Sequence, residues 1–422
     1  MQVKLEQLAA YRASGTPRGI SSVCSAHPII LRAALRHGLQ SGATVLIEAT
    51  CNQVNHLGGY TGMKPADFVA LVCRIAAEEG CPVEQIVLGG DHLGPNPWRD
   101  RDAEAAMAEA EKMVAAYVAA GFRKIHLDAS MGCKDEPVAL DDAVTAARAV
   151  RLAAVAEKTA KDVGGDMPCY IIGTEVPTPG GADHALDTII PTAPEAVRQT
   201  LAVHREAFAQ AGLADAFNRV IGIVVQPGAE FGNRNVIFYD REKAQSLVRV
   251  LDGEPGLVFE AHSTDYQGAK PLAGLVEDGF AILKVGPELT FVLREALYAL
   301  DVIASDLVPG YGERPLKQEM ERLMLADPGN WNRHYYGDAA TQAVLRHYSL
   351  SDRIRYYWAT VAAEKAVARL IAALTGRNIP LPMMWQYLPA ATDFADAPLE
   401  PETFLIWRVT QSLQAYHAAC NG

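Results

Sequence analysis

The sequence predicts an α/β protein built as a (β/α)8 TIM barrel with a C-terminal helical extension. Three observations lead to this prediction. Short apolar runs alternate with segments of helical spacing, the runs are apolar throughout, and each ends in polar or small residues. Strands that are apolar on both faces are typical of a parallel sheet covered by helices. A doubly wound open sheet is the alternative with the same alternation.

Eight apolar runs rich in branched residues are expected to be the strands. They span 19–27, 44–50, 85–92, 124–130, 169–175, 221–228, 257–263 and 281–287. The segments between them carry apolar residues three and four positions apart and close on glycine, as in 64–80 and 103–121, which is typical of helices. Eight such units over about 290 residues match a TIM barrel, which has roughly 250 residues with room for insertions.

The pattern changes near residue 300. Residues 318–374 have the spacing of helices separated by turn residues, and they are rich in Tyr, Trp, His and Arg. The chain is therefore expected to divide into a barrel, 1–301, and a helical extension packed on it, 302–422.

The composition excludes several classes of protein. The chain has 422 residues, of which 50% are hydrophobic and 21% charged, and a formal net charge of -12 without a basic cluster, which argues against nucleic acid as a partner. Residues 1–15 lack the apolar segment of a signal peptide and no run of membrane-spanning length follows, so we expect a cytoplasmic protein with no membrane partner. Seven cysteines without CxxC spacing argue against a disulfide framework and against a zinc knuckle.

Polar side chains gather at the ends of the predicted strands. Because the carboxyl ends of all barrel strands meet on one face, these residues are expected to form one active site. They are Glu48, Cys51, Asn52, Asp91, His92, Asp128, Cys133, Glu175, Gln226, Glu230, Glu260, His262, Ser263, Asp265, Lys284 and Glu288.

Carboxylates directed at one small volume repel one another unless a cation lies among them. A divalent metal ligated by His92 and His262, with Glu175 or Glu230 as the carboxylate ligand, is the simplest neutralising arrangement. An open position on such a metal polarises a substrate oxygen. The imidazole of His126, inside its strand, is expected to be a hydrogen-bonded structural group.

Other residues are expected to act on the substrate. Acid, base or electrostatic roles are assigned to Asp91, Glu175, Glu48 and Lys284, and substrate contacts to Asn52, Asp128, Gln226, Ser263, Asp265, Arg353 and Arg355. For the two arginines, aromatic packing and a phosphate clamp are equal alternatives. A Schiff base on Lys284 is the weaker option beside histidine metal ligands.

A set of long motifs carries a resemblance that covers nearly the whole chain. They are "IEATCNQVNHLGGYTGM", "LGGDHLGPNPW", "HLDASMGC", "IGTEVPTPGG", "QPGAEFG" and "FEAHSTDYQ". Together they resemble the GatZ/KbaZ family, named as the non-catalytic Z subunit of class II tagatose-bisphosphate aldolase and related to class II fructose-bisphosphate aldolases. The resemblance implies a metal-type barrel acting in galactitol or tagatose catabolism.

The resemblance also implies roles for single residues. Asp91 matches the aldolase carboxylate that moves the proton of the C4 hydroxyl, His92 and His262 match metal ligands, and zinc is the implied ion. The third aldolase histidine has no counterpart in 226–233, "QPGAEFGN", which offers Gln226 or Glu230 instead. Ser263 falls where the aldolases bind a substrate phosphate.

Two functions of different classes follow. We favour 4-epimerisation of tagatose 6-phosphate and fructose 6-phosphate by retro-aldol and aldol chemistry, with a phosphorylated ketohexose as substrate. The alternative is a non-catalytic subunit that stabilises a class II aldolase catalytic subunit. A homo-oligomer is expected in either case. A kinase activity is disfavoured because the sequence has no GxxxxGK[ST] loop.

Overall fold

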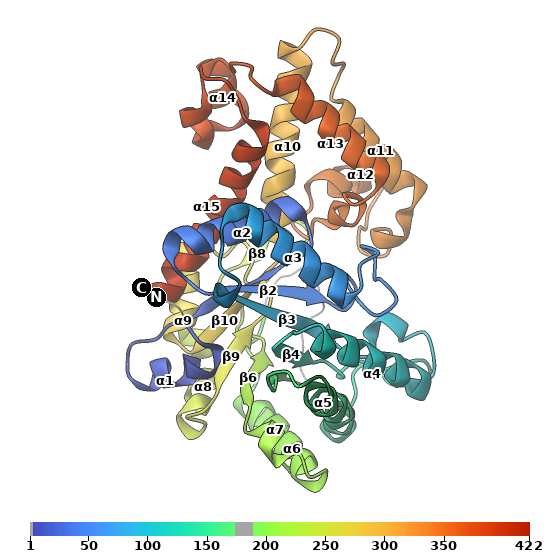
Figure 1. Ribbon diagram of the computed structural model, residues 1–422, viewed down its shortest axis with the longest axis vertical. Coiled ribbons are helices and arrows are strands. Elements are labelled where there is room, and N and C mark those ends of the chain that lie inside the picture. The colour runs from blue at the N-terminus through green and yellow to red at the C-terminus, as the bar shows by residue number, and fades with distance from the viewer. Residues whose placement is uncertain (1–2, 174–188) are drawn as a thin grey trace.

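The computed structural model describes residues 3–173 and 189–422, and it confirms the predicted barrel (Figure 1). In this part of the chain, parallel strands close in the spatial order β1-β10-β9-β6-β5-β4-β3-β2. The strands are β1 Ile20–Cys24, β2 Val45–Thr50, β3 Ile86–Leu93, β4 Lys124–Leu127, β5 Cys169–Ile172, β6 Val220–Val225, β9 Val258–Ala261 and β10 Phe280–Val285. Each coincides with one of the expected apolar runs.

Helices cover the outside of the barrel. Between successive strands lie α2 Pro28–Ser41, α3 Pro65–Glu79, α4 Ala103–Ala119, α5 Asp142–Val163, α6 Pro194–Gln210, α8 Arg241–Val248 and α9 Ala269–Glu277. Local chemistry sets their bounds: the side chains of Asp102 and Asp141 accept hydrogen bonds from the first turns of α4 and α5, and the left-handed backbone of Gly80 ends α3. None of the helices in the described ranges is long and apolar enough to span a membrane.

The division into a barrel, 1–301, and an extension, 302–422, stays a prediction; the expected boundary falls inside α10 Pro287–Leu307, the first long helix of the C-terminal region. The other helices of this region are α11 Pro315–Ala326, α12 Ala339–Tyr348, α13 Val361–Leu374, α14 Leu381–Tyr387 and α15 Pro401–Asn421. Figure 1 shows α15 returning from this extension to the barrel, where it packs against α2, α9 and β1. The backbone N–H of Gly19 donates to the carbonyl of Cys420 at 2.9 Å. The last helix of the extension therefore completes the outer layer of the barrel.

Tyr416 on α15 ties this helix to the end of β9 that bears the polar residues. Its buried hydroxyl donates to the carbonyl of Thr264 at 2.8 Å. We expect Tyr416→Phe to lower the free energy of unfolding by about 1–3 kcal/mol, because the buried carbonyl loses a donor. Urea unfolding measures this change. The exposed Tyr336→Phe is the matched control, and equal stability of the two variants would contradict the prediction.

Candidate active site

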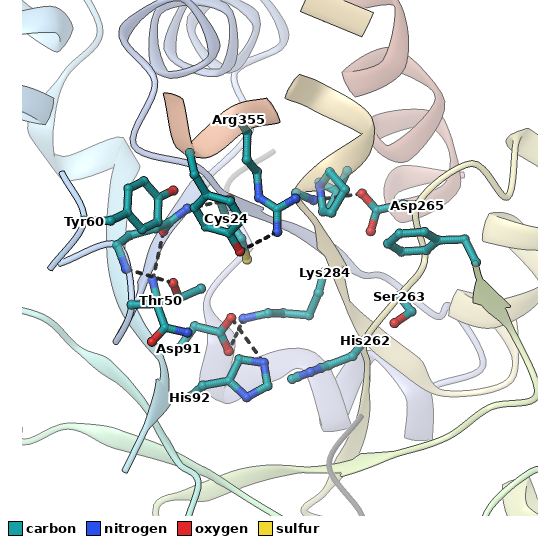
Figure 2. A pocket seen from close by; sticks show the side chains of 17 residues that line it. Cys24, Thr50, Tyr60, Asp91, His92, His262, Ser263, Asp265, Lys284 and Arg355 are labelled. Atoms are coloured by element: carbon teal, nitrogen blue, oxygen red, sulfur yellow. Dashed lines mark hydrogen bonds and ion pairs between the residues drawn. The ribbon is translucent and has the colours of Figure 1, made fainter. Parts of the chain in front are cut away.

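The carboxyl ends of the strands surround a pocket of about 670 Å³ (Figure 2). Strand ends of the barrel form its floor, and the short 3-10 helix Arg353–Tyr357 of the extension contributes one wall. The sequence-predicted residues that line it are Asn52, Asp91, His92, His262, Ser263, Asp265, Lys284 and Arg355. The barrel thus brings residues from distant parts of the sequence together, as the strand-end argument predicted.

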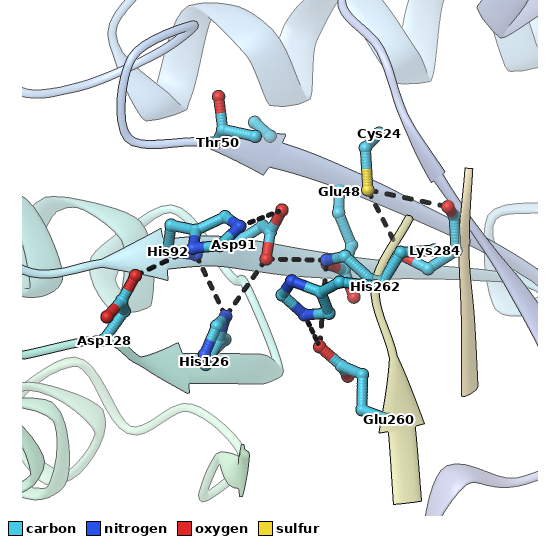
Figure 3. Close-up of polar contacts among 12 residues, drawn as sticks. Cys24, Glu48, Thr50, Asp91, His92, His126, Asp128, Glu260, His262 and Lys284 are labelled. Atoms are coloured by element: carbon cyan, nitrogen blue, oxygen red, sulfur yellow. Dashed lines mark hydrogen bonds and ion pairs between the residues drawn. The ribbon is translucent and has the colours of Figure 1, made fainter. Parts of the chain in front are cut away.

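Three imidazoles and one carboxylate form a compact group, of which Asp91, His92 and His262 line the floor of the pocket and His126 lies beneath it (Figure 3). Each of Asp91, His92, His126 and His262 offers an atom that can ligate a metal, and these atoms lie within 4.8 Å of one another. The ring centroids of the histidines are 4.9 to 5.3 Å apart, and all four side chains are buried. We call these four residues the histidine cluster.

His126 is the member of the cluster that the sequence analysis assigned to a structural role. Its ring projects from β4, and its Nδ1 lies 3.1 Å from Oδ1 of Asp91. Its buried Nε2 has no hydrogen-bond partner in the described part of the chain. Nδ1 also lies 3.2 Å from the backbone N–H of His92, which donates to it when the ring proton is on Nε2. In the other tautomer Nδ1–H donates to Asp91, and Nε2 then carries the free lone pair that a metal requires. His126 on β4 thus lies where it could supply a third imidazole, which 226–233 does not offer.

Asp128 orients His92 from the side away from the other rings. Its Oδ2 lies 2.7 Å from Nδ1 of His92. Burial disfavours the charged carboxylate, but the hydrogen bond and charge of His92, together with His126 and Ser130, outweigh burial and lower the pKa of Asp128 to about 2. Asp91 and Asp128 likewise overcome the burial of His92 and raise its pKa. Burial lowers the pKa of His262 to about 3, which keeps this ring neutral and able to ligate a cation.

A network of buried charges lies beneath the cluster. Lys124, which is fully buried, has its Nζ 2.6 Å from carboxylate oxygens of both Glu48 and Glu260. Lys284 pairs with Glu48, and its Nζ lies 2.7 Å from Oδ1 of Asp91. Burial disfavours the ammonium of Lys284, but Asp91, Glu48 and the other acidic neighbours together outweigh this effect and hold the pKa of Lys284 well above its ordinary value. The carboxylate of Glu260 in turn accepts a hydrogen bond from Nε2–H of His262 at 2.9 Å.

The sum of these charges fits a divalent cation. Two ammonium groups, on Lys124 and Lys284, face four carboxylates, on Glu48, Asp91, Asp128 and Glu260. Two negative charges therefore remain in excess when the imidazoles are neutral. Burial opposes the charge on Asp91, but His92 and Lys284 outweigh it and hold the pKa of Asp91 well below its ordinary value. The histidine cluster offers nitrogen and oxygen donors suited to zinc and similar ions.

Asp128→Asn tests the support of His92. Because an imidazole ligand is oriented by its outer hydrogen bond, this change is expected to lower the affinity for a divalent metal by about 10- to 100-fold. Titration calorimetry with Zn²⁺ measures the affinity. Asp162→Asn, at an exposed surface ion pair, is the control, and equal affinities of the two variants would contradict the orienting role of Asp128.

Several predicted site residues have other partners. Asp128 holds His92 and does not line the pocket. The amide oxygen of Gln226 accepts from the backbone N–H of Gly228 at 2.8 Å and so folds its own loop. Glu230 accepts from the N–H of Phe231 at 3.0 Å and is not a member of the histidine cluster. Its role as a metal ligand stays a prediction.

The remaining predicted residues differ in their positions. Glu175 lies outside the described residues. Glu48 lies deeper than the pocket, between the two buried lysines. Of the two arginines, Arg355 lines the pocket, whereas Arg353 is not among the lining residues and donates to the carbonyl of Asn330 at 3.2 Å.

Comparisons with known proteins show the family of this chain. A family model described as D-tagatose-1,6-bisphosphate aldolase subunit GatZ/KbaZ-like matches residues 5–421. The chain belongs to this family. The resemblance stated from the motifs is thereby confirmed.

Two relatives of this GatZ/KbaZ-like chain are similar over nearly their whole length. The D-tagatose 6-phosphate 4-epimerase of Agrobacterium fabrum is 62% identical over 419 residues, and the match covers 99% of each chain. A crystal structure of a probable tagatose 6 phosphate kinase from Sinorhizobium meliloti 1021 is 51% identical, with a TM-score of 0.87, and the match covers 96% of this chain and 100% of that chain.

Proposed function

We propose that this chain is an enzyme that interconverts tagatose 6-phosphate and fructose 6-phosphate by inverting carbon 4. The observation that carries the proposal is the histidine cluster beside Lys284 on the floor of the pocket. The similarity to a D-tagatose 6-phosphate 4-epimerase over 99% of the chain supports the same substrate.

The cofactor proposed is a divalent metal, with Zn²⁺ as the first ion to test. His92, His126 and His262 would hold it, with Asp91 beside them. A bound cation of this kind supplies Lewis-acid polarisation of the substrate carbonyl. The side chains of the protein then have to hold the substrate and move one proton.

Asp91 is the group proposed to move that proton. Its carboxylate takes the proton from the C4 hydroxyl while the C3–C4 bond breaks, and the electron pair of this bond stays on the C1–C3 fragment as an enediolate. The C4–C6 fragment is then an aldehyde. When it presents its other face, the bond forms again and Asp91 returns the proton to the C4 oxygen. Lys284, 2.7 Å from Asp91, keeps this carboxylate charged before the bond breaks, so that it can accept the proton.

Two other functions have some support in the names of the relatives. The family description names an aldolase subunit, and the Sinorhizobium relative is titled a probable kinase. A stabilising subunit has no need of the buried metal-ligand set, and the sequence lacks the GxxxxGK[ST] loop of many kinases. Both are outcomes of the experiment below.

The purified chain alone, supplemented with Zn²⁺ or Mn²⁺, is incubated with tagatose 6-phosphate, and fructose 6-phosphate is measured by chromatography. We expect conversion that chelation of the metal stops. Asp91→Ala is expected to lose the conversion and retain the fold, and His92→Ala to lose both the conversion and the metal.

The negative outcomes differ from one another. Metal binding without conversion would contradict the proposed choice of substrate. Neither metal binding nor conversion, together with stabilisation of a class II aldolase, would support the subunit function. Consumption of ATP that depends on the sugar phosphate would support the kinase.

A further inference from the structure

We propose that the phosphate of the substrate is bound by Arg355, on the wall that the helical extension contributes, and not at the amino-terminal end of α10. This inference rests on the proposed function and specifies which end of the pocket receives the anion. Four observations support it.

The amino-terminal end of α10 is already occupied by carboxylates of the protein. TIM-barrel enzymes frequently bind phosphate at helix ends that follow the seventh and eighth strands, which here are β9 and β10. Oδ1 of Asp265 accepts from the backbone N–H groups of Gly286 at 3.0 Å and Glu288 at 2.7 Å. Glu288 itself accepts from the N–H of Tyr266 at 2.6 Å. A phosphate at this helix end would have to displace Asp265 from these two N–H groups.

Lys284 and Arg355 are the lysine and arginine side chains among the described residues that line the pocket. Lys284 is paired with Glu48 and Asp91. Arg355 forms no ion pair with a carboxylate in the described ranges. Its guanidinium donates to the carbonyls of Ser351 and Asp352, the latter at 3.1 Å, and to the hydroxyl of Tyr356 at 2.9 Å. These neutral partners fix the group and leave its positive charge available for an anion.

Contacts with neighbouring parts of the chain fix the position of Arg355. Arg294 on α10 lies 2.7 Å from Oδ1 of Asp352, and both side chains are almost completely buried. The backbone of Asp352 is in the left-handed region, with φ of 46°, where the chain turns into the 3-10 helix that carries Arg355. Tyr356 packs edge-on against Tyr60, with ring centroids 4.8 Å apart. The position of Arg355 is therefore preorganised before substrate enters.

The position of Arg355 also matches the chemistry of the substrate. Figure 2 shows Arg355 on one side of the pocket and His92 and His262 on the other, with Lys284 between them. In the proposed reaction the histidine cluster and Asp91 act at the carbonyl and at the C3–C4 bond, whereas the phosphate is on carbon 6. The cluster, Lys284 and Arg355 therefore follow one another in the same order as the reacting carbons and the phosphate of an extended ketohexose 6-phosphate.

The test compares Arg355→Gln with Arg355→Lys and with Arg322→Gln, a control at an exposed ion pair of the same extension. Hydrogen bonds from a charged donor are strong, so Arg355→Gln is expected to raise KM for tagatose 6-phosphate by about 10- to 100-fold with little change in kcat. The lysine variant is expected to recover part of this loss. The rate of Arg355→Gln with unphosphorylated tagatose is expected to equal that of the wild-type protein. Arg322→Gln is expected to keep the wild-type KM and kcat for tagatose 6-phosphate.

A second measurement needs no turnover. Inorganic phosphate is titrated into each metal-loaded protein by calorimetry, and its affinity is expected to fall in Arg355→Gln by the same factor as for the substrate. Phosphate binding that persists in Arg355→Gln and is strengthened in Asp265→Asn, which removes the carboxylate from the amino-terminal end of α10, would overturn the inference, as would a wild-type protein that binds no phosphate. Arg355-dependent phosphate binding without conversion of tagatose 6-phosphate would refute the proposed reaction and support the anion site.

Discussion

Replacing His126 with alanine is expected to remove the bound metal and to lower the rate of conversion of tagatose 6-phosphate by at least about 100-fold. The expected loss is this large because Lewis-acid stabilisation contributes several kcal/mol to a transition state. Metal content after dialysis, measured by inductively coupled plasma mass spectrometry, reports the first effect and the epimerase assay the second.

His204→Ala is the matched control for this experiment. His204 is also a fully buried histidine with an unpartnered ring nitrogen, but it lies on α6 and belongs to no group of potential metal ligands in the described part of the chain. This variant therefore separates the loss of a buried imidazole from the loss of a ligand. Full metal content in His126→Ala would show that β4 contributes no ligand.

Replacing Lys124 with methionine is expected to lower the free energy of unfolding by about 3–5 kcal/mol. The ammonium lies between Glu48 and Glu260 at 0% exposure, so its removal leaves two carboxylates buried and in repulsion. Denaturant unfolding followed by circular dichroism gives the change. Lys158→Met, at an exposed ion pair with Asp162, is expected to change stability by less than about 1 kcal/mol.

A second substitution tests the electrostatic cause. Adding Glu48→Gln to Lys124→Met removes one of the stranded charges and is expected to restore part of the lost stability. The free energy lost on changing Glu48→Gln is therefore compared in the wild-type protein and in Lys124→Met. An equal loss in both would indicate that the lysine acts through packing alone.

The strands and the strand-end residues were predictable because both depend on local sequence. A strand that is buried on both faces is apolar along its length, and polar residues are accommodated near its carboxyl end. Asp91, His92 and His262 lie at such ends. The barrel then follows from the repetition of these units, and the convergence of the strand ends follows from the barrel.

The inner layer of the barrel was harder to predict. Alternate residues at β4, namely Lys124, His126 and Asp128, contact the charge network or the cluster, and this period of two was a signal in the sequence. It was overlooked because a charge inside a strand is costly unless partners surround it. Those partners, among them Glu48 and Glu260, come from strands far away in the sequence.

The choice between Arg353 and Arg355 also required the structure. The two residues are two positions apart on one short 3-10 helix, so they point in different directions. Which one faces the pocket depends on the turn at Asp352 and on its pairing with Arg294. Neither feature has a local sequence pattern, because α10 and this turn meet only through tertiary packing.

The return of α15 to the barrel has a consequence for synthesis of the protein on the ribosome. Strand β1 and helix α2 emerge early, but the helix that covers them is translated last. Until then, the apolar surface between α2 and α9 faces solvent, although every strand of the barrel has already been made. Nascent chains that contain the complete sheet should therefore still bind chaperones, and release from them should coincide with the docking of this final helix.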